Sequence, residues 1–96
     1  MAHARPDDLK HLRAQLDELR CWPRLKERSP GIFYFGAKPF LHFHTEGSRL
    51  WADVKRSAGG WSEIPATTKR DRDAFLKCAA AFYEEIAGVR LQSNRL

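Results

Sequence analysis

The sequence predicts a single α+β domain over residues 1–96, in which a four-stranded antiparallel meander carries an N-terminal and a C-terminal helix on one face. Apolar residues recur at helical spacing near both ends of the chain, and between these segments they alternate with polar residues as they do in strands. A chain of 96 residues has room for one hydrophobic core, and its 43% hydrophobic and 30% charged residues are typical of a globular domain. The predicted order of elements is αββββα.

The first helix is predicted from about Pro6 to Trp22. Proline is favoured in the first turn of a helix, and Pro23 ends the helix because a proline ring is incompatible with a further turn. Four leucines lie on one face of this helix, namely Leu9, Leu12, Leu16 and Leu19. Residues 24–28, which are mostly charged, and the Ser-Pro-Gly that follows them at 29–31 are interpreted as a connecting loop.

From Ile32 the period of the apolar residues changes to two, and strands are predicted at 32–35, 40–45, 49–55 and 61–64. The last strand is expected at a sheet edge, because the proline that follows it cannot donate to a ladder.

Two-residue turns are assigned to Ala37-Lys38 and to Glu46-Gly47, where glycine supplies the positive φ that such a turn needs. The Glu46-Gly47 turn places Asp53 opposite Phe40. The Ala37-Lys38 turn places residues 33 and 35 on the face away from the core. A change of one residue in the Ala37-Lys38 turn would move both residues to the other face, so the face on which residues 33 and 35 lie stays open.

The final helix is predicted to begin after Thr67 or Thr68, either of which can cap it, and to end at Gly88. Its core-facing residues are expected to be Phe75, Cys78, Ala79, Phe82 and Ile86. Cys21 and Cys78 are too far apart in sequence for a CxxC pair, and both are interpreted as small buried apolar residues.

The second hairpin sorts its side chains into two unlike sets. One set is apolar and is expected in the core: Leu41, Phe43, Leu50, Ala52 and Val54. The other set combines aromatic, imidazole and charged groups on what we call the open face, the side of the sheet away from the helices: Phe40, His42, His44, Arg49, Trp51, Asp53 and Lys55. The open face is the predicted functional surface.

The favoured hypothesis is a non-catalytic binding or interaction domain that uses the open face. Several exposed aromatic residues would form an apolar patch that a partner protein or a second copy of the chain would cover. The alternative is single-stranded nucleic acid stacking on these rings, which the formal net charge of +5 favours.

A metal-dependent site at His42 and His44 is a further alternative, because residues two apart on a strand share a face. Asp53 or Glu46 could supply a third ligand, and metal-assisted hydrolysis would then be the reaction class. However, the predicted register places Asp53 far from His44. No metal site, cofactor or catalytic residue is therefore predicted. Neither Ser48 nor Ser62 lies in the glycine-flanked elbow of a nucleophilic serine, and the chain has no glycine-rich phosphate loop.

A cytoplasmic location is expected. The N-terminal residues lack the apolar segment of a signal peptide, and no apolar stretch approaches the roughly 20 residues of a membrane span.

Three segments carry a resemblance to known sequences: KPFLHFH (38–44), ADVK (52–55) and GWSEIPATTKRD (60–71). With them the chain resembles a group of small bacterial proteins known only from genome sequences, which share a PG-F start to the first strand, here Pro30, Gly31 and Phe33. The resemblance runs from about Ser29 into the last helix. It implies a bacterial, cytoplasmic α+β protein and carries over no catalytic residue. The order of elements is also similar to that of YjbR-like, DNA-binding-associated domains, without a shared motif that would transfer their role.

Overall fold

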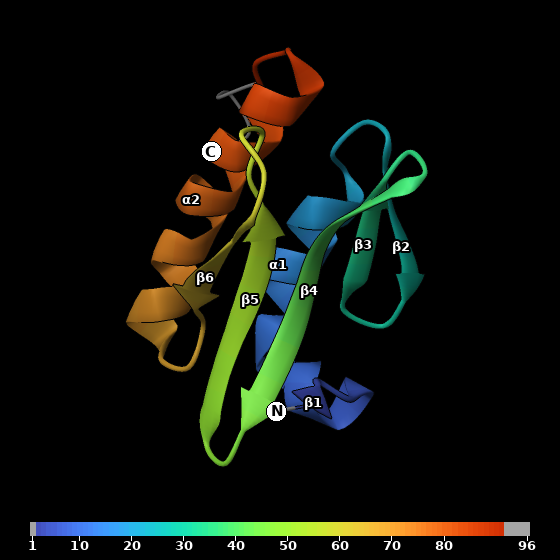
Figure 1. The fold of residues 1–96 in the computed structure, drawn as a ribbon. Helices are drawn as coiled ribbons and strands as arrows, with labels where there is room; N and C mark the ends of the chain where they lie inside the picture. Colours follow the sequence, from blue (N-terminus) through green and yellow to red (C-terminus); the bar gives the residue numbers. More distant parts are fainter. Residues whose placement is uncertain (1, 92–96) are drawn as a thin grey trace.

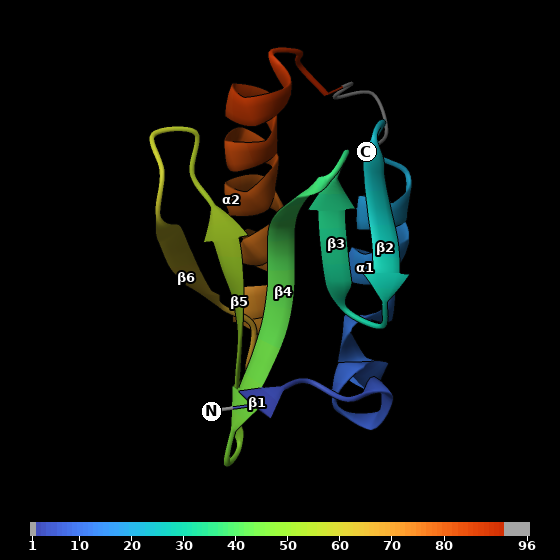
Figure 2. The same ribbon diagram turned by 45° about the vertical axis from the view of Figure 1, so that its right-hand side comes forward.

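In the computed structural model, which describes residues 2–91, five strands follow one another in an antiparallel sheet of order β2-β3-β4-β5-β6, and two helices lie on one side of it (Figures 1 and 2). A sixth strand, β1, has two residues and pairs with the C-terminal half of β4. The elements are β1 (Ala2–His3), the 3₁₀ helix η1 (Pro6–Leu12), α1 (Arg13–Arg20), β2 (Leu25–Ser29), β3 (Ile32–Phe35), β4 (Lys38–Glu46), β5 (Arg49–Lys55), β6 (Trp61–Pro65) and α2 (Lys69–Ala87).

The predicted α+β class, with a helix toward each end and an antiparallel meander between them, is confirmed. The predicted number of strands is wrong, because the meander has five strands and β1 adds a sixth. The predicted domain limits, residues 1 and 96, lie outside the described residues.

The additional strand of the meander, β2, occupies the segment that was predicted to be a loop. It pairs with β3, and only Leu25 of its five residues is buried. A charged strand with one buried side chain is typical of a sheet edge, where charges discourage pairing with other chains. The alternation that identifies a half-buried strand is therefore missing from this segment.

The N-terminal helix has two parts. Residues Pro6–Leu12 form a 3₁₀ helix, and the α-helix begins only at Arg13. With three residues per turn, the 3₁₀ part places Leu9 and Leu12 on the same side. All four predicted core leucines, Leu9, Leu12, Leu16 and Leu19, are buried.

A β-bulge in β4 turns Phe40 into the core. Phe33 pairs with Leu41 and Tyr34 pairs with Pro39, so Phe40 has no partner on β3. Its side chain is 1% exposed and meets the ring of Tyr83 edge-on, with ring centroids 6.2 Å apart. The prediction that Phe40 lies on the open face is therefore wrong.

The turn before this bulge also differs from the prediction. Phe35 pairs with Lys38, so the loop is Gly36-Ala37. In this register Phe33 is fully buried in the core, and Phe35 packs against the ring of Tyr83. Both therefore lie on the side opposite to the one that the Ala37-Lys38 turn implied.

The C-terminal helix begins and ends as predicted. Thr68 caps it by accepting a hydrogen bond from the N–H of Asp71 at 3.0 Å, and Gly88 ends it in the left-handed conformation, with φ +72°. Phe75 and Ala79 are buried as expected, whereas Cys78 is exposed. The second cysteine, Cys21, is also exposed, so the expectation that both thiols are buried is wrong. Phe82 and Ile86 are partly buried against the core.

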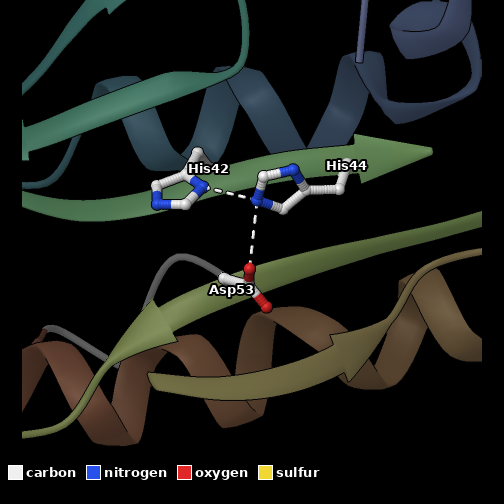
Figure 3. A group of neighbouring side chains, drawn as sticks. All are labelled: His42, His44 and Asp53. Carbon is white, nitrogen blue, oxygen red and sulfur yellow. Dashed lines mark hydrogen bonds and ion pairs between the residues drawn. The ribbon is translucent and has the colours of Figure 1, made fainter. Parts of the chain in front are cut away.

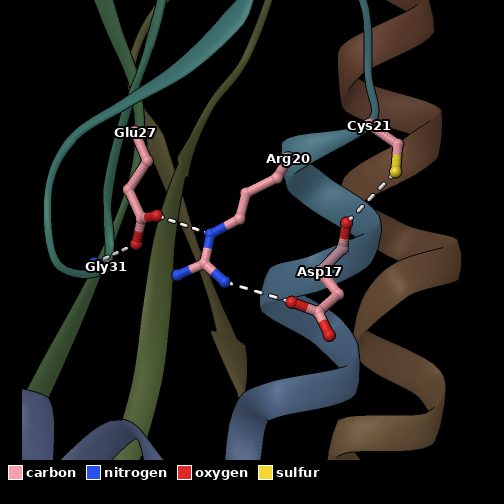
Figure 4. A network of polar contacts seen from close by, with 5 residues as sticks. All are labelled: Asp17, Arg20, Cys21, Glu27 and Gly31. Carbon is pink, nitrogen blue, oxygen red and sulfur yellow. Dashed lines mark hydrogen bonds and ion pairs between the residues drawn. The ribbon is translucent and has the colours of Figure 1, made fainter.

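A polar network joins α1 to the hairpin of β2 and β3 (Figure 4). Glu27 accepts hydrogen bonds from Arg20 Nε at 2.6 Å and from the N–H of Gly31 at 2.9 Å, and Arg20 also pairs with Asp17. Burial by itself would raise the pKa of the Glu27 carboxyl, but the two hydrogen bonds and the charge of Arg20 together lower it below its ordinary value of 4.5.

A carboxylate with a lowered pKa in the folded state stabilises the fold above its unfolded pKa, and this stabilisation is lost as the pH falls through the lowered value. We expect Glu27→Gln to reduce the free energy of unfolding at pH 7 by about 1 kcal/mol, a modest value because solvent screens Arg20, which is half exposed. The deficit should shrink as the pH falls below 4.5, the ordinary pKa of this group. Urea denaturation of both proteins at pH 7 and pH 3 measures it. An equal deficit at both pH values would contradict the role assigned to this carboxylate.

Candidate functional site

The turn between β4 and β5 decides which side chains meet on the open face. Glu46 pairs with Arg49, so the two-residue loop is Gly47-Ser48, one position later than predicted. Gly47 has a φ of +61°, and glycine at the first loop position is typical of the type II′ turn, whose twist matches that of paired strands.

This turn shifts β5 against β4 by two residues relative to the prediction. An even shift leaves each side chain on its predicted face but changes its partner across the hairpin. Asp53, predicted opposite Phe40, lies opposite His42, and Trp51 lies opposite His44. The prediction that Asp53 lies far from His44 is therefore wrong, and with it the geometric argument against a site of three ligands.

Three side chains converge on the open face, two from β4 and one from β5 (Figure 3). Nε2 of His44 lies 2.7 Å from Nδ1 of His42 and 3.0 Å from Oδ2 of Asp53. One ligand atom from each residue lies within 4.8 Å of both others. His44 is 7% exposed, while His42 and Asp53 are half-buried, so the cluster has an inner and an outer side. We call these residues the His-His-Asp cluster.

The two short contacts of the His-His-Asp cluster compete for the same atom. A neutral imidazole carries a single N–H, and its other nitrogen is an acceptor. A proton on Nε2 of His44 can therefore reach the Asp53 oxygen and Nδ1 of His42 only as a shared, bent hydrogen bond. A proton on Nδ1 of His42 instead leaves the lone pair of Nε2 facing the carboxylate at 3.0 Å. A cation among the three atoms would interact favourably with all of them.

Trp51 flanks the cluster on its inner side. Its ring centroid lies 5.7 Å from that of His44, and the guanidinium of Arg49 covers it at 4.1 Å. The side chain is 1% exposed. Trp51 thus lies on the predicted face but acts there as packing, and it is not a surface for a ligand.

Trp61 flanks the cluster on its outer side. Its ring centroid lies 4.8 Å from that of His42, and Nζ of Lys55 lies 5.3 Å from the indole centroid. Trp61 is 42% exposed. Sequence analysis did not place Trp61 on the open face, although the alternation of β6 puts Trp61 and Glu63 on the same face as Asp53.

Of the six predicted site residues, the structure brings His42, His44 and Asp53 together, and it places Trp51 and Arg49 beside them. It removes Phe40 to the core. Among residues 2–91 the exposed large apolar side chains are Trp61 and Val89. The hypotheses of a protein interface and of nucleic-acid stacking stay predictions, but Trp51 and Phe40 do not supply the exposed rings on which they were based.

Comparisons with protein-family models, with curated proteins and with solved structures find no match to this chain. The resemblances to small bacterial proteins and to YjbR-like domains stay predictions. Within the described part of the chain, no helix has the length and apolar character that crossing a membrane requires.

The contrast between the two flanking tryptophans can be measured. We expect Trp51→Ala to lower the free energy of unfolding by about 3–5 kcal/mol, because it removes a fully buried ring. The matched change Trp61→Ala should cost less than about 1 kcal/mol, because the ring is already partly in water. Urea denaturation followed by circular dichroism compares them. Small and equal losses would mean that Trp51 is a surface residue in solution.

Proposed function

We propose that this protein binds one divalent transition-metal ion, with Zn²⁺ as the expected ion, through the His-His-Asp cluster. The observation that carries the proposal is that one ligand atom from each of His42, His44 and Asp53 lies within 4.8 Å of both others. Two imidazoles and one carboxylate are a ligand set that zinc accepts in proteins, whereas calcium and magnesium prefer oxygen ligands alone.

The spacing of the three atoms supports zinc. With bonds of about 2.0–2.1 Å, neighbouring ligand atoms of a tetrahedral zinc ion lie about 3.3 Å apart. The contacts of 2.7 and 3.0 Å around His44 would have to lengthen by less than 1 Å. The ligand atoms of His42 and Asp53 lie at most 4.8 Å apart and would have to approach about 3.3 Å. His42 and Asp53 are half-buried, so packing constrains their side chains less than the ring of His44, which is buried.

Three protein ligands leave one coordination position of a tetrahedral ion for water or a substrate. Zinc in such a position lowers the pKa of its bound water and polarises carbonyl or phosphoryl oxygens. If the fourth position is open, metal-assisted hydrolysis is the reaction class that the site supports.

Binding of a protein partner, a second copy or single-stranded nucleic acid by the open face is a second proposal. The group that favours it is Trp61, an exposed ring with the ammonium of Lys55 beside it.

A bacterial cytoplasmic location is also proposed, and the two free cysteines suit a reducing compartment.

Isothermal titration with Zn²⁺ tests the metal site. We expect one ion per chain, with affinity weakened at least tenfold in His44→Ala and in Asp53→Asn, because each change removes a ligand. Affinity should also fall as the pH is lowered, since histidine and carboxylate ligands bind the metal in their deprotonated forms. His11→Ala, an exposed histidine on η1, is the matched control and should bind as the unmodified protein does. Unchanged affinity in both ligand variants would refute the site.

A further inference from the structure

We propose that Glu63 is a fourth ligand of this metal centre and that Arg49 competes with the metal for it. The inference rests on the proposed metal site and specifies how that site is completed and regulated. It assigns a role to Glu63, which is not among the site residues predicted from the sequence.

The sheet register places Glu63 in line with the cluster. His42 on β4 pairs with Asp53 on β5, and Asp53 pairs in turn with Glu63 on β6. The three residues therefore form one row across three strands. Residues that pair directly across strands have Cβ atoms about 4.5–5.5 Å apart and project from the same face. A carboxylate at the end of this row is within reach of an ion held by His42 and Asp53.

The row also places two carboxylates side by side, and like charges that pair across strands are unfavourable. Glu63 is turned to Arg49, whose Nη2 lies 2.8 Å from Oε1 of Glu63. Both side chains of this ion pair are about half exposed, at 52% and 56%, and ion pairs so exposed to solvent are weak. A divalent ion beside Asp53 would attract both carboxylates and so offset the repulsion between them. It would then displace Arg49, whose ion pair with Glu63 is weak.

Two neutral imidazoles and two carboxylates together carry a charge of −2, which balances a divalent cation, and they supply the four ligands of a closed tetrahedral zinc site. Arg49 then decides between two forms of the centre. When it holds Glu63, the fourth position is open to water. When it releases Glu63, the fourth position is closed by protein.

Zn²⁺ affinity, measured by competition with a chelator, tests the two roles in opposite directions. We expect Glu63→Gln to weaken binding at least tenfold and Arg49→Gln to tighten it about two- to tenfold, because Glu63 is then free to ligate. In the double variant the gain from Arg49→Gln should disappear. Glu85→Gln removes the same charge from an exposed position of α2, on the other side of the sheet, and it should change affinity less than threefold.

The outcomes separate this inference from the metal site on which it rests. If His44→Ala and Asp53→Asn bind Zn²⁺ as the unmodified protein does, the metal site itself is refuted. If those variants lose binding while Glu63→Gln stays within threefold of the unmodified protein, the role of Glu63 is refuted and the three-ligand site remains. If Arg49→Gln weakens binding or leaves it unchanged, the competition is refuted.

Discussion

The candidate site depends on the register between β4 and β5, which the loop Gly47-Ser48 sets. A two-residue loop with glycine at its first position leaves no freedom in the pairing that follows. Because of that pairing His42 meets Asp53, and the strand period of two brings His44 to the same face. The predicted register differs from this one by two residues. It would keep all the residues of the site on one face, but it would place Asp53 opposite Phe40 and so too far from His44 for the cluster to form.

The other face of the same strands makes this arrangement rigid. Leu41, Phe43, Ala52 and Val54 alternate with the site residues and are fully or almost fully buried under the helices. The histidines and the aspartate are therefore held by a packed core one residue away in each direction along the chain. Beside them Trp51 fills the inner side, so the cluster does not depend on mobile loops for its shape.

The sequence predicts those parts of the fold that local chemistry determines. The cap at Thr68, the buried leucines of the first helix and the faces of β4 and β5 all follow from residue type and period. Three features do not. The edge strand Leu25–Ser29 has no alternation, the bulge at Phe40 reverses a face without a local signal, and glycine permits more than one loop position at residue 47. The bulge and the loop position, which concern pairing between strands, determine which side chains meet, so the site was less predictable than the fold.

Anomalous X-ray diffraction from crystals grown with Zn²⁺, recorded on both sides of the zinc absorption edge, locates the ion directly. We expect one strong peak on the open face, about 2.0–2.2 Å from His42 Nδ1, His44 Nε2 and an oxygen of Asp53. A peak at the exposed cysteines or at His11 with none at this cluster, or no bound zinc at all, would contradict the proposed metal site.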